Sequence, residues 1–391
     1  MSEKSIFTKA VHAGEDPERH HVAVSTPIYN STVFKFPDLE TGADIHNWRT
    51  EGFFYGRLGN PTQQALERAV CELESGEDAL CFASGMAAIA AATLTFVKHG
   101  DHMVVPEAVY ATTGAFFRFI EEKFGISSTF VDSADPENYR RAVRPETKLL
   151  YIETPSNPTC RITDISAVAA IAKEHGVSTI CDNTFATPFN QNPLLMGCDV
   201  VIHSATKYLG GHSDLSAGIV VGSRAVIERA RHGTSKLFGG SIAPEVAWLV
   251  MRGIKTLPLR MERHNSNAER IASFLAEHPN VVKVFHPSLT GDAGHEIAKR
   301  QMRGFGAMLS FDLGSYDAAK RFLNQMKVVT LATSLGGVET LAQHSASMTA
   351  ANVPQEEREK TGITDGLIRM SVGIEDVNDL ISDIDQALQG E

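Results

Sequence analysis

Short apolar segments alternate with helical patterns along most of this chain, and this alternation limits the folds that it can adopt. Strands are expected at about residues 79–82, 102–105, 148–152, 177–181, 199–203 and 218–222, with helices between most of them. Strands separated by helices pair in parallel, because each helix returns the chain to the same end of the sheet. The sequence therefore predicts an α/β fold with a mostly parallel sheet wrapped by helices.

A smaller α/β unit is expected after this sheet. A long helix over about 242–275, which Pro258 can kink, leads to strands near 281–285, 305–312 and 367–372 and to a closing helix over 377–388. Residues 1–58 show little periodicity and many turn formers, which is typical of an extended arm. We therefore expect an arm at 1–58, a large domain at 59–252 and a C-terminal domain at 253–391.

Composition narrows the class of protein. A net charge of −11 over 391 residues, without a basic cluster, argues against a nucleic-acid surface. No apolar run reaches membrane-span length, and the polar residues 1–5 do not resemble a signal peptide. The five cysteines lack metal-ligand spacing, so we expect reduced thiols, no metal site and a cytoplasmic protein.

Lys207 follows an apolar strand in the run HSATKYLGG, residues 203–211. The run places its amine and the hydroxyls of Ser204 and Thr206 at the end of a buried strand, where a lysine is costly unless it is paired, neutralised or covalently engaged. Hydroxyls can bind a phosphate while the amine forms a Schiff base with an aldehyde, which is how pyridoxal phosphate is held. A surface lysine is the alternative, and this run alone does not decide between them.

Asp182 ends another apolar strand and precedes Lys207 by 25 positions. That distance suits one loop and one further strand, so both groups are expected at the carboxyl ends of neighbouring strands, where open α/β sheets bind ligands. The pyridine nitrogen of pyridoxal phosphate requires such an acidic partner. A turn cap after the strand is the alternative reading of Asp182.

Ser84 and Gly85 stand between a predicted strand and an Ala-rich helix. The free N–H groups and the dipole of a helix start favour an anion, and Gly85 lets the backbone approach it closely. An ordinary Ser N-cap is the favoured explanation of this motif taken alone. The phosphate-binding reading therefore depends on the other two segments.

In this order, these three segments resemble the Cys/Met-metabolism family of pyridoxal-phosphate enzymes. Further matches cover nearly the whole chain: STPIY at 25–29, YGRLGNPT at 55–62, ETPSNPT at 153–159, RGIKTL at 252–257, SLGGVETL at 334–341 and LIRMSVG at 367–373. The resemblance implies the type I fold of these enzymes, with a seven-stranded sheet in the large domain, and pyridoxal 5′-phosphate as cofactor. It also implies a homotetramer in which the arm reaches a neighbouring subunit.

The resemblance assigns roles to residues of this chain. Lys207 would bind the cofactor covalently and carry the proton, and Tyr110 would stack over the pyridine ring. Residues expected to hold the cofactor are Tyr55 and Arg57 (from the partner subunit), Ser84, Gly85, Met86, Tyr110, Asp182, Ser204, Thr206 and Lys207. The substrate would contact Asn157, Thr333, Ser334 and Arg369. Arg369 would bind the α-carboxylate, although a structural salt bridge would also explain an arginine in an apolar strand.

The family's chemistry includes α,γ-elimination from sulfur amino acids, and the sequence favours methionine γ-lyase activity. Cystathionine-handling members carry Glu before the Ser-Leu-Gly-Gly run, where this chain has Thr333, and cystathionine γ-lyases carry Arg where it has Ala115. Thr112, however, replaces a Cys typical of methionine γ-lyases. The alternatives are γ-replacement on O-acetyl- or O-succinylhomoserine, a cystathionine γ- or β-lyase, and a non-enzymatic homologue that only binds the cofactor.

Overall fold

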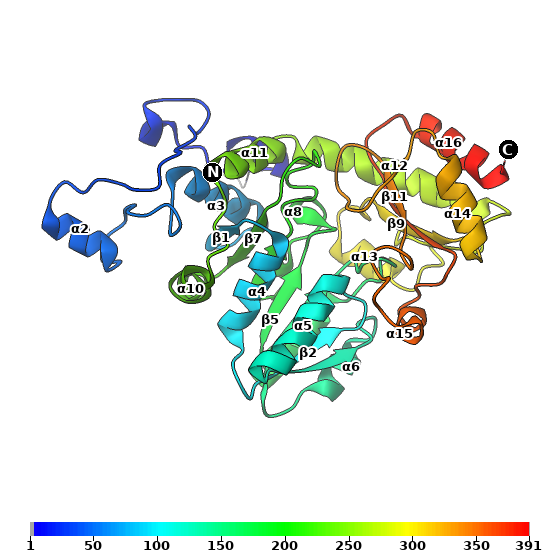
Figure 1. Cartoon of the computed structure of the whole chain (residues 1–391), viewed down its shortest axis with the longest axis horizontal. Coiled ribbons are helices and arrows are strands. Elements are labelled where there is room, and N and C mark those ends of the chain that lie inside the picture. The colour runs from blue at the N-terminus through cyan, green and yellow to red at the C-terminus, as the bar shows by residue number, and fades with distance from the viewer. Residues whose placement is uncertain (1–3, 391) are drawn as a thin grey trace.

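The computed structural model describes residues 4–390, so the first three of the polar residues 1–5 lie outside it. The larger sheet contains β1 (Asp78–Phe82), β2 (His102–Pro106), β3 (Ser127–Val131), β4 (Thr147–Glu153), β5 (Ser178–Asp182), β6 (Val200–His203) and β7 (Gly218–Gly222). Its strand order is β1-β7-β6-β5-β4-β2-β3 (Figure 1). β7 is antiparallel to both neighbours, and the other pairs are parallel. The expected mostly parallel, seven-stranded sheet is confirmed.

Helices cover both faces of this sheet. One face packs against α4 (Gly85–Phe96), α5 (Ala111–Phe124) and α9 (Arg224–Ala230), through a cluster that includes Leu80, Tyr151 and Ile202. The opposite face packs against α3 (Pro61–Glu74), α6 (Pro136–Ala142), α7 (Ile165–His175) and α11 (Pro244–Ile254). Successive strand residues point to opposite faces, so β4 contributes Tyr151 to the first cluster and Ile152 to the second.

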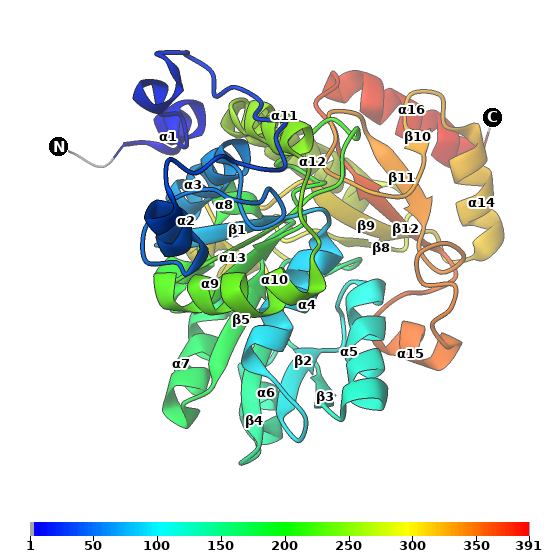
Figure 2. The same cartoon turned by 60° about the vertical axis from the view of Figure 1, so that its left-hand side comes forward.

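The smaller sheet contains β8 (Lys283–Phe285), β9 (Met308–Asp312), β10 (Thr330–Leu331), β11 (Leu341–His344) and β12 (Leu367–Ser371). Its order is β10-β11-β12-β9-β8, and it lies beside the larger sheet in Figure 2. α12 (Leu257–Glu277), α14 (Tyr316–Gln325) and α16 (Val377–Gln389) pack on it. The remaining helical segments are Ile6–His12 (α1), Pro17–His20, Leu39–His46 (α2), Thr187–Asn190 (α8), Pro193–Met196, Arg231–Ser235, Lys236–Phe238 (α10), His295–Gln301 (α13) and Gln355–Lys360 (α15).

The single long helix expected at 242–275 is wrong. α11 ends at Ile254, and α12 begins at Leu257 with Pro258 in its first turn. Proline is favoured there because the first N–H groups of a helix have no intrahelical partner. Pro258 therefore marks a new helix and not a kink.

The start of the chain is only partly an extended arm. α1 buries Ala10 in the main core, beside α3 and α12. α2 lies well away from the two sheets, at the left of Figure 1. Residues 4–58 leave apolar side chains exposed, among them Val22 and Val24 between the helices and Leu39 in α2. Within residues 4–390, no helix has the length and apolarity that a membrane span requires.

Candidate active site

The carboxyl ends of five strands of the larger sheet point toward one edge. Ser84 follows β1, Tyr110 follows β2, Asn157 follows β4, Asp182 ends β5 and Lys207 follows β6. This edge is where open α/β sheets bind ligands. The fold therefore gathers at one edge predicted site residues that lie more than a hundred positions apart in the sequence.

Lys207 lies in a tight turn after β6. Its N–H donates to the carbonyl of Ser204 (3.1 Å), and its own carbonyl accepts from the N–H of Gly211 (2.7 Å). The amine Nζ donates to Oγ of Ser334 at 2.7 Å. Burial lowers the pKa of Lys207 to about 8, and the charge of Arg369 acts in the same direction. An appreciable share of the amine is therefore unprotonated near neutral pH, as a nucleophile or base requires.

Asp182 is a buried carboxyl at the end of β5, with 8% of the residue exposed. Oδ1 accepts the N–H of Thr184 at 3.0 Å. Burial raises the pKa of Asp182, while its hydrogen bonds with Thr184 oppose that rise. Between residues 4 and 390, no lysine or arginine contacts this carboxyl. A cationic ring nitrogen would therefore relieve the cost of its burial.

The first turn of α4 lies against the turn that carries Lys207. Ser84 is its N-cap and accepts the N–H of Ala87 at 3.1 Å, as the alternative reading of this motif expected. A Cβ at position 85 would lie 2.9 Å from both Cβ and Oγ of Ser204, so only glycine permits this approach. The helix start and the Ser204 hydroxyl therefore form one small, positively polarised corner.

Two other residues expected at the phosphate have their own contacts. The hydroxyl of Thr206 donates to the carbonyl of Ala217 (3.2 Å) and accepts its N–H (3.0 Å). The sulfur of Met86 accepts from the hydroxyl of Thr113 at 3.9 Å. Thr206 thus fixes the Lys207 turn to the segment before β7, and its contact with a phosphate remains a prediction.

Tyr110 precedes α5 and leaves its ring partly free. The residue is 40% exposed, and its N–H donates to the carboxyl of Glu153 at 3.0 and 3.1 Å. Glu153 was not predicted as a site residue. It ends β4 directly beside Asp182 of β5. A carboxylate that ends an apolar strand is the signal that identified Asp182, and the same signal was available for Glu153.

Arg369 of β12 is only 4% exposed and lies close to Lys207. Nη1 donates to Oδ1 of Asn157 (3.3 Å), and Nη2 donates to the carbonyl of Ser334 (2.5 Å). Its Nε has no partner in the described part of the chain, and no carboxylate pairs with the guanidinium there. The alternative of a structural salt bridge is thus wrong, and burial lowers the pKa of Arg369 to about 10.

Tyr55 and Arg57 lie on the N-terminal arm. The guanidinium of Arg57 donates to the carbonyl of Lys236 at 2.6 Å and lies 5.6 Å from the centre of the Tyr55 ring. Tyr55 is itself 40% exposed. These contacts hold the pair on the arm and α10, and its expected contribution to a neighbouring subunit stays a prediction.

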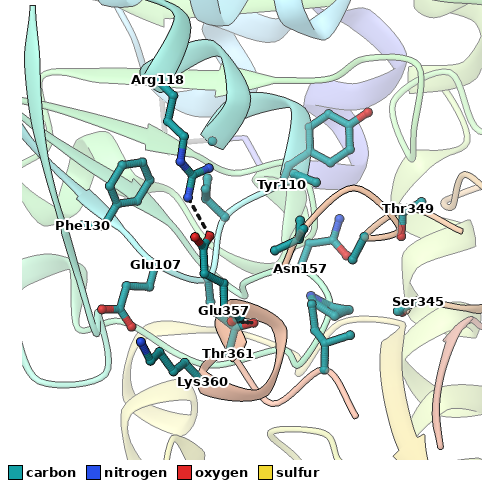
Figure 3. A pocket seen from close by; sticks show the side chains of 18 residues that line it. Glu107, Tyr110, Arg118, Phe130, Asn157, Ser345, Thr349, Glu357, Lys360 and Thr361 are labelled. Atoms are coloured by element: carbon teal, nitrogen blue, oxygen red, sulfur yellow. Dashed lines mark hydrogen bonds and ion pairs between the residues drawn. The ribbon is translucent and has the colours of Figure 1, made fainter. Parts of the chain in front are cut away.

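A cavity of about 250 Å³ adjoins Tyr110 and Asn157 (Figure 3). The ion pair of Arg118 and Glu357, 3.0 Å long, joins α5 to α15 across it. Glu107 and Lys360 also line it. The cavity therefore carries charges of both signs next to the predicted cofactor-stacking ring.

The positions that the sequence indicated for substrate specificity are exposed and uncharged. They are Thr112, Ala115 and Thr333.

These groups fit one kind of cofactor. The buried amine of Lys207 suits an aldehyde, the carboxyl of Asp182 suits a protonated ring nitrogen, and the helix start at Gly85 suits a phosphate. The guanidinium of Arg369, which contacts no carboxylate among the described residues, suits the carboxylate of an amino acid. The site thus suits pyridoxal phosphate together with an amino-acid substrate.

Comparisons with known proteins agree with this chemistry. Residues 7–389 match the family described as Cys/Met metabolism PLP-dependent enzyme. The chain is 48% identical over 389 residues to cystathionine gamma-lyase of Bacillus subtilis, with full coverage of both chains. It is 44% identical to L-methionine gamma-lyase of Pseudomonas putida, covering 98% of this chain and 96% of the other. The crystal structure of metB from Corynebacterium glutamicum superposes with a TM-score of 0.93 at 39% identity, covering 99% of this chain and 98% of that one.

Proposed function

The chain belongs to the Cys/Met metabolism family of PLP-dependent enzymes and is a pyridoxal-phosphate-dependent carbon–sulfur lyase, and we propose that it acts on L-methionine or a related sulfur amino acid with an uncharged distal end. The proposed reaction is α,γ-elimination, in which water is consumed and a thiol, ammonia and 2-oxobutanoate are formed. One observation carries the proposal: Lys207 and Arg369 both contact Ser334, so a base and a carboxylate binder are held side by side.

Each residue has a defined task in this reaction. When bound, pyridoxal phosphate stabilises the negative charge that develops on the substrate carbons. Arg369, oriented by Asn157 and Ser334, binds the α-carboxylate of the substrate and so directs its Cα–H bond. Nζ of Lys207 accepts the Cα proton, because its lowered pKa keeps part of the amine unprotonated near neutral pH.

Other groups hold the cofactor in this proposal. Asp182 balances the charge of the ring nitrogen, the ring of Tyr110 covers the pyridine ring, and the start of α4 with Ser204 binds the phosphate. We further propose a cytoplasmic homotetramer in which Tyr55 and Arg57 of a neighbouring subunit complete the phosphate site. The exposed apolar residues of the arm support such an assembly.

Cystathionine cleavage is a second candidate. The cavity beside Tyr110 presents Glu107 and Glu357 together with Arg118 and Lys360. The distal part of cystathionine is itself an amino acid with an ammonium and a carboxylate, and charges of both signs complement it. The cystathionine gamma-lyase of Bacillus subtilis also aligns along the entire chain. Against this candidate, Thr333 and Ala115 offer no charge of their own.

A substrate panel separates these candidates. The protein loaded with pyridoxal phosphate is incubated with methionine, homocysteine, cystathionine, cysteine, and O-acetylhomoserine with and without sulfide, and every product is identified. We expect methanethiol and 2-oxobutanoate from methionine, with a higher kcat/KM than for cystathionine. Faster cleavage of cystathionine would establish the second candidate, with release of cysteine indicating γ-elimination and release of homocysteine indicating β-elimination. If products form only from O-acetylhomoserine with sulfide, the reaction of this protein is γ-replacement and not elimination.

A further inference from the structure

Glu153 ends β4 as a buried carboxyl that binds main-chain groups of two site residues. Only 5% of the residue is exposed. Oε1 accepts the N–H of Tyr110 (3.1 Å) and the N–H of Asn157 (3.2 Å), and Oε2 also accepts the N–H of Tyr110 (3.0 Å). One side chain thus connects the segment after β2 to the segment after β4.

Glu153 and Asp182 are direct partners in the parallel pairing of β4 with β5. In such a pair, side chains in register point to the same face of the sheet, so the two carboxyls are neighbours. Burial raises the pKa of both, and the charge of Asp182 raises that of Glu153 further. In the described chain no lysine or arginine contacts Glu153. Burial and the charge of the neighbouring Asp182 therefore both favour the neutral form of Glu153.

The two residues that Glu153 binds need their main chain fixed. Tyr110 is 40% exposed, so packing alone holds its ring only partly. Asn157 accepts a hydrogen bond from Arg369 through its side chain, so a shift of its backbone would move the proposed carboxylate binder. Buried N–H groups that lose their acceptor are costly, and the loops would rearrange to find another one.

We propose that Glu153 is a positioning residue, which acts as a hydrogen-bond acceptor to hold Tyr110 and Asn157 at the cofactor and substrate sites. This inference rests on the proposed function, because it takes Tyr110 to cover the cofactor and Asn157 to orient Arg369. Glu153 itself touches neither ligand in this scheme. The side-chain oxygen Oε1 accepts both N–H groups and can do so in a neutral carboxyl, so the side chain of Glu153 need not be ionised.

Two substitutions at this position test the role. Glu153→Gln keeps an acceptor at the site of Oε1, which receives both N–H groups, and it mimics a neutral carboxyl. Glu153→Leu removes the acceptor at similar volume. The matched control is Asp101→Leu: Asp101 is also a buried carboxyl that accepts a main-chain N–H, from Lys98 at 2.9 Å, but it precedes β2 at the opposite edge of the larger sheet.

The first readout is the affinity of the cofactor-free protein for pyridoxal phosphate, which is measured by visible absorbance. The second readout is the visible circular dichroism of the bound cofactor. We expect Glu153→Leu to raise the Kd by about tenfold or more, the size expected for an unmade buried hydrogen bond, and to reduce the circular dichroism band. Its KM for methionine should rise as well, because Asn157 is displaced. Glu153→Gln should stay within about threefold of the unmodified protein in all three quantities. Asp101→Leu should lower only the Tm.

The outcomes separate three cases. If Glu153→Leu keeps the unmodified Kd and dichroism, Glu153 is not a positioning residue. If Glu153→Gln fails as badly as Glu153→Leu, the charge matters and the acceptor role is wrong. Should Glu153→Leu not fold, Glu153→Asp replaces it, because the shorter side chain withdraws the acceptor and should shift the same three quantities. A failure of the unmodified protein to bind pyridoxal phosphate would instead overturn the proposed function.

Discussion

The amine of Lys207 and the hydroxyl of Ser334 are hydrogen-bonded at 2.7 Å, although the two residues belong to segments that follow different sheets. Lys207 follows β6 of the larger sheet, and Ser334 lies between β10 and β11 of the smaller one. Ser334 adopts a left-handed conformation with φ of 77°, which is uncommon for a residue other than glycine. The carbonyl of Ser334 also accepts from Arg369. Ser334 is therefore the point at which the proposed base and the proposed carboxylate binder meet.

Lys207 should be the residue that attaches the cofactor. The loaded protein should be yellow, and reduction with borohydride should fix the cofactor to the peptide that contains Lys207, as mass spectrometry would show. Lys207→Ala should bind the cofactor weakly, through the groups at the start of α4, and should lose nearly all turnover. An adduct on a different lysine would disprove the assignment.

The amine of Lys207 should titrate well below an ordinary lysine in the cofactor-free protein. A pKa of about 8 means that the reactive, unprotonated share at pH 7 exceeds that of an ordinary lysine by about two orders of magnitude. The rate at which an amine-specific reagent labels Lys207 should therefore rise with pH around a midpoint near 8. A midpoint at the ordinary lysine value of about 10.4 would contradict the burial argument.

Ser334→Ala should shift the midpoint of the Lys207 titration downward. The Ser334 hydroxyl accepts a hydrogen bond from Nζ and so stabilises the charged amine of Lys207. Without this hydrogen bond, burial should lower the pKa of Lys207 further. The main-chain carbonyl that binds Arg369 remains in this variant. An unchanged or higher midpoint would show that the hydrogen bond does not stabilise the ammonium.

Arg369→Lys should weaken recognition of the substrate carboxylate. Lysine keeps the charge but cannot supply the planar pair of N–H donors, so KM for methionine should rise by roughly ten- to hundredfold. The visible absorbance of the loaded protein should be unchanged. Inhibition by 3-(methylthio)propylamine, which lacks the carboxylate, serves as the control and should change little. Equal losses for both ligands would place Arg369 away from the carboxylate.

Mixing two inactive variants should restore activity if the site is shared between subunits. Arg57→Ala and Lys207→Ala disable different chains of a shared site, so hybrids regain intact sites, up to about a quarter of full activity for random pairing. The control pairs Lys207→Ala with Asp182→Ala. Both of these residues lie at the sheet edge of one chain, so no hybrid site is intact and no recovery is expected. Equal recovery in both mixtures, or none in either with hybrids verified, would reject the shared site.

Thr333→Glu should raise the ratio of kcat/KM for cystathionine over methionine. The carboxylate would meet the distal ammonium of cystathionine and would stay unpaired with methionine. Thr333 is exposed, so a gain of about 1 kcal/mol, or about fivefold, is the appropriate expectation for a screened pair. Thr333→Gln controls for size. If the Gln variant shifts the ratio equally, or the Glu variant does not shift it, Thr333 does not select substrates by charge.

The strands that could be predicted most readily from the sequence are those buried between helices on both faces of the larger sheet. β4, β5 and β6 each contain a short apolar segment and are almost entirely buried, because both faces of each strand are covered by helices. β3 escaped notice because this edge strand begins Ser127-Ser128-Thr129 and is mostly half-buried. β11 also lacks the pattern, because two of its four buried residues, Gln343 and His344, are polar.

The site was predictable where one residue carries a distinctive chemistry. The lysine and aspartate after apolar strands, and the glycine at a helix start, identified the cofactor edge. Contacts between segments distant in sequence could not be predicted in the same way. Nothing local to Ser334 indicates that it meets Lys207, and nothing local to Glu153 indicates that it binds the N–H of Tyr110. The first contact depends on how the two sheets are arranged in space, and the second depends on the pairing of β2 with β4 within the larger sheet.

Arg369 is a strand residue of the smaller sheet, yet one of its acceptors, Asn157, belongs to the larger. The guanidinium that is proposed to bind the substrate therefore also makes a contact between the parts of the molecule that contain the two sheets. An apolar core shared by both parts holds them together, and the contact of Arg369 with Asn157 adds a polar link at the substrate site. A change in how the carboxylate is held would therefore also change this polar link. Substrate specificity can then change at positions that do not join the two sheets, such as the exposed Thr333. Binding of the α-carboxylate stays the same, because Arg369 also connects the two sheets.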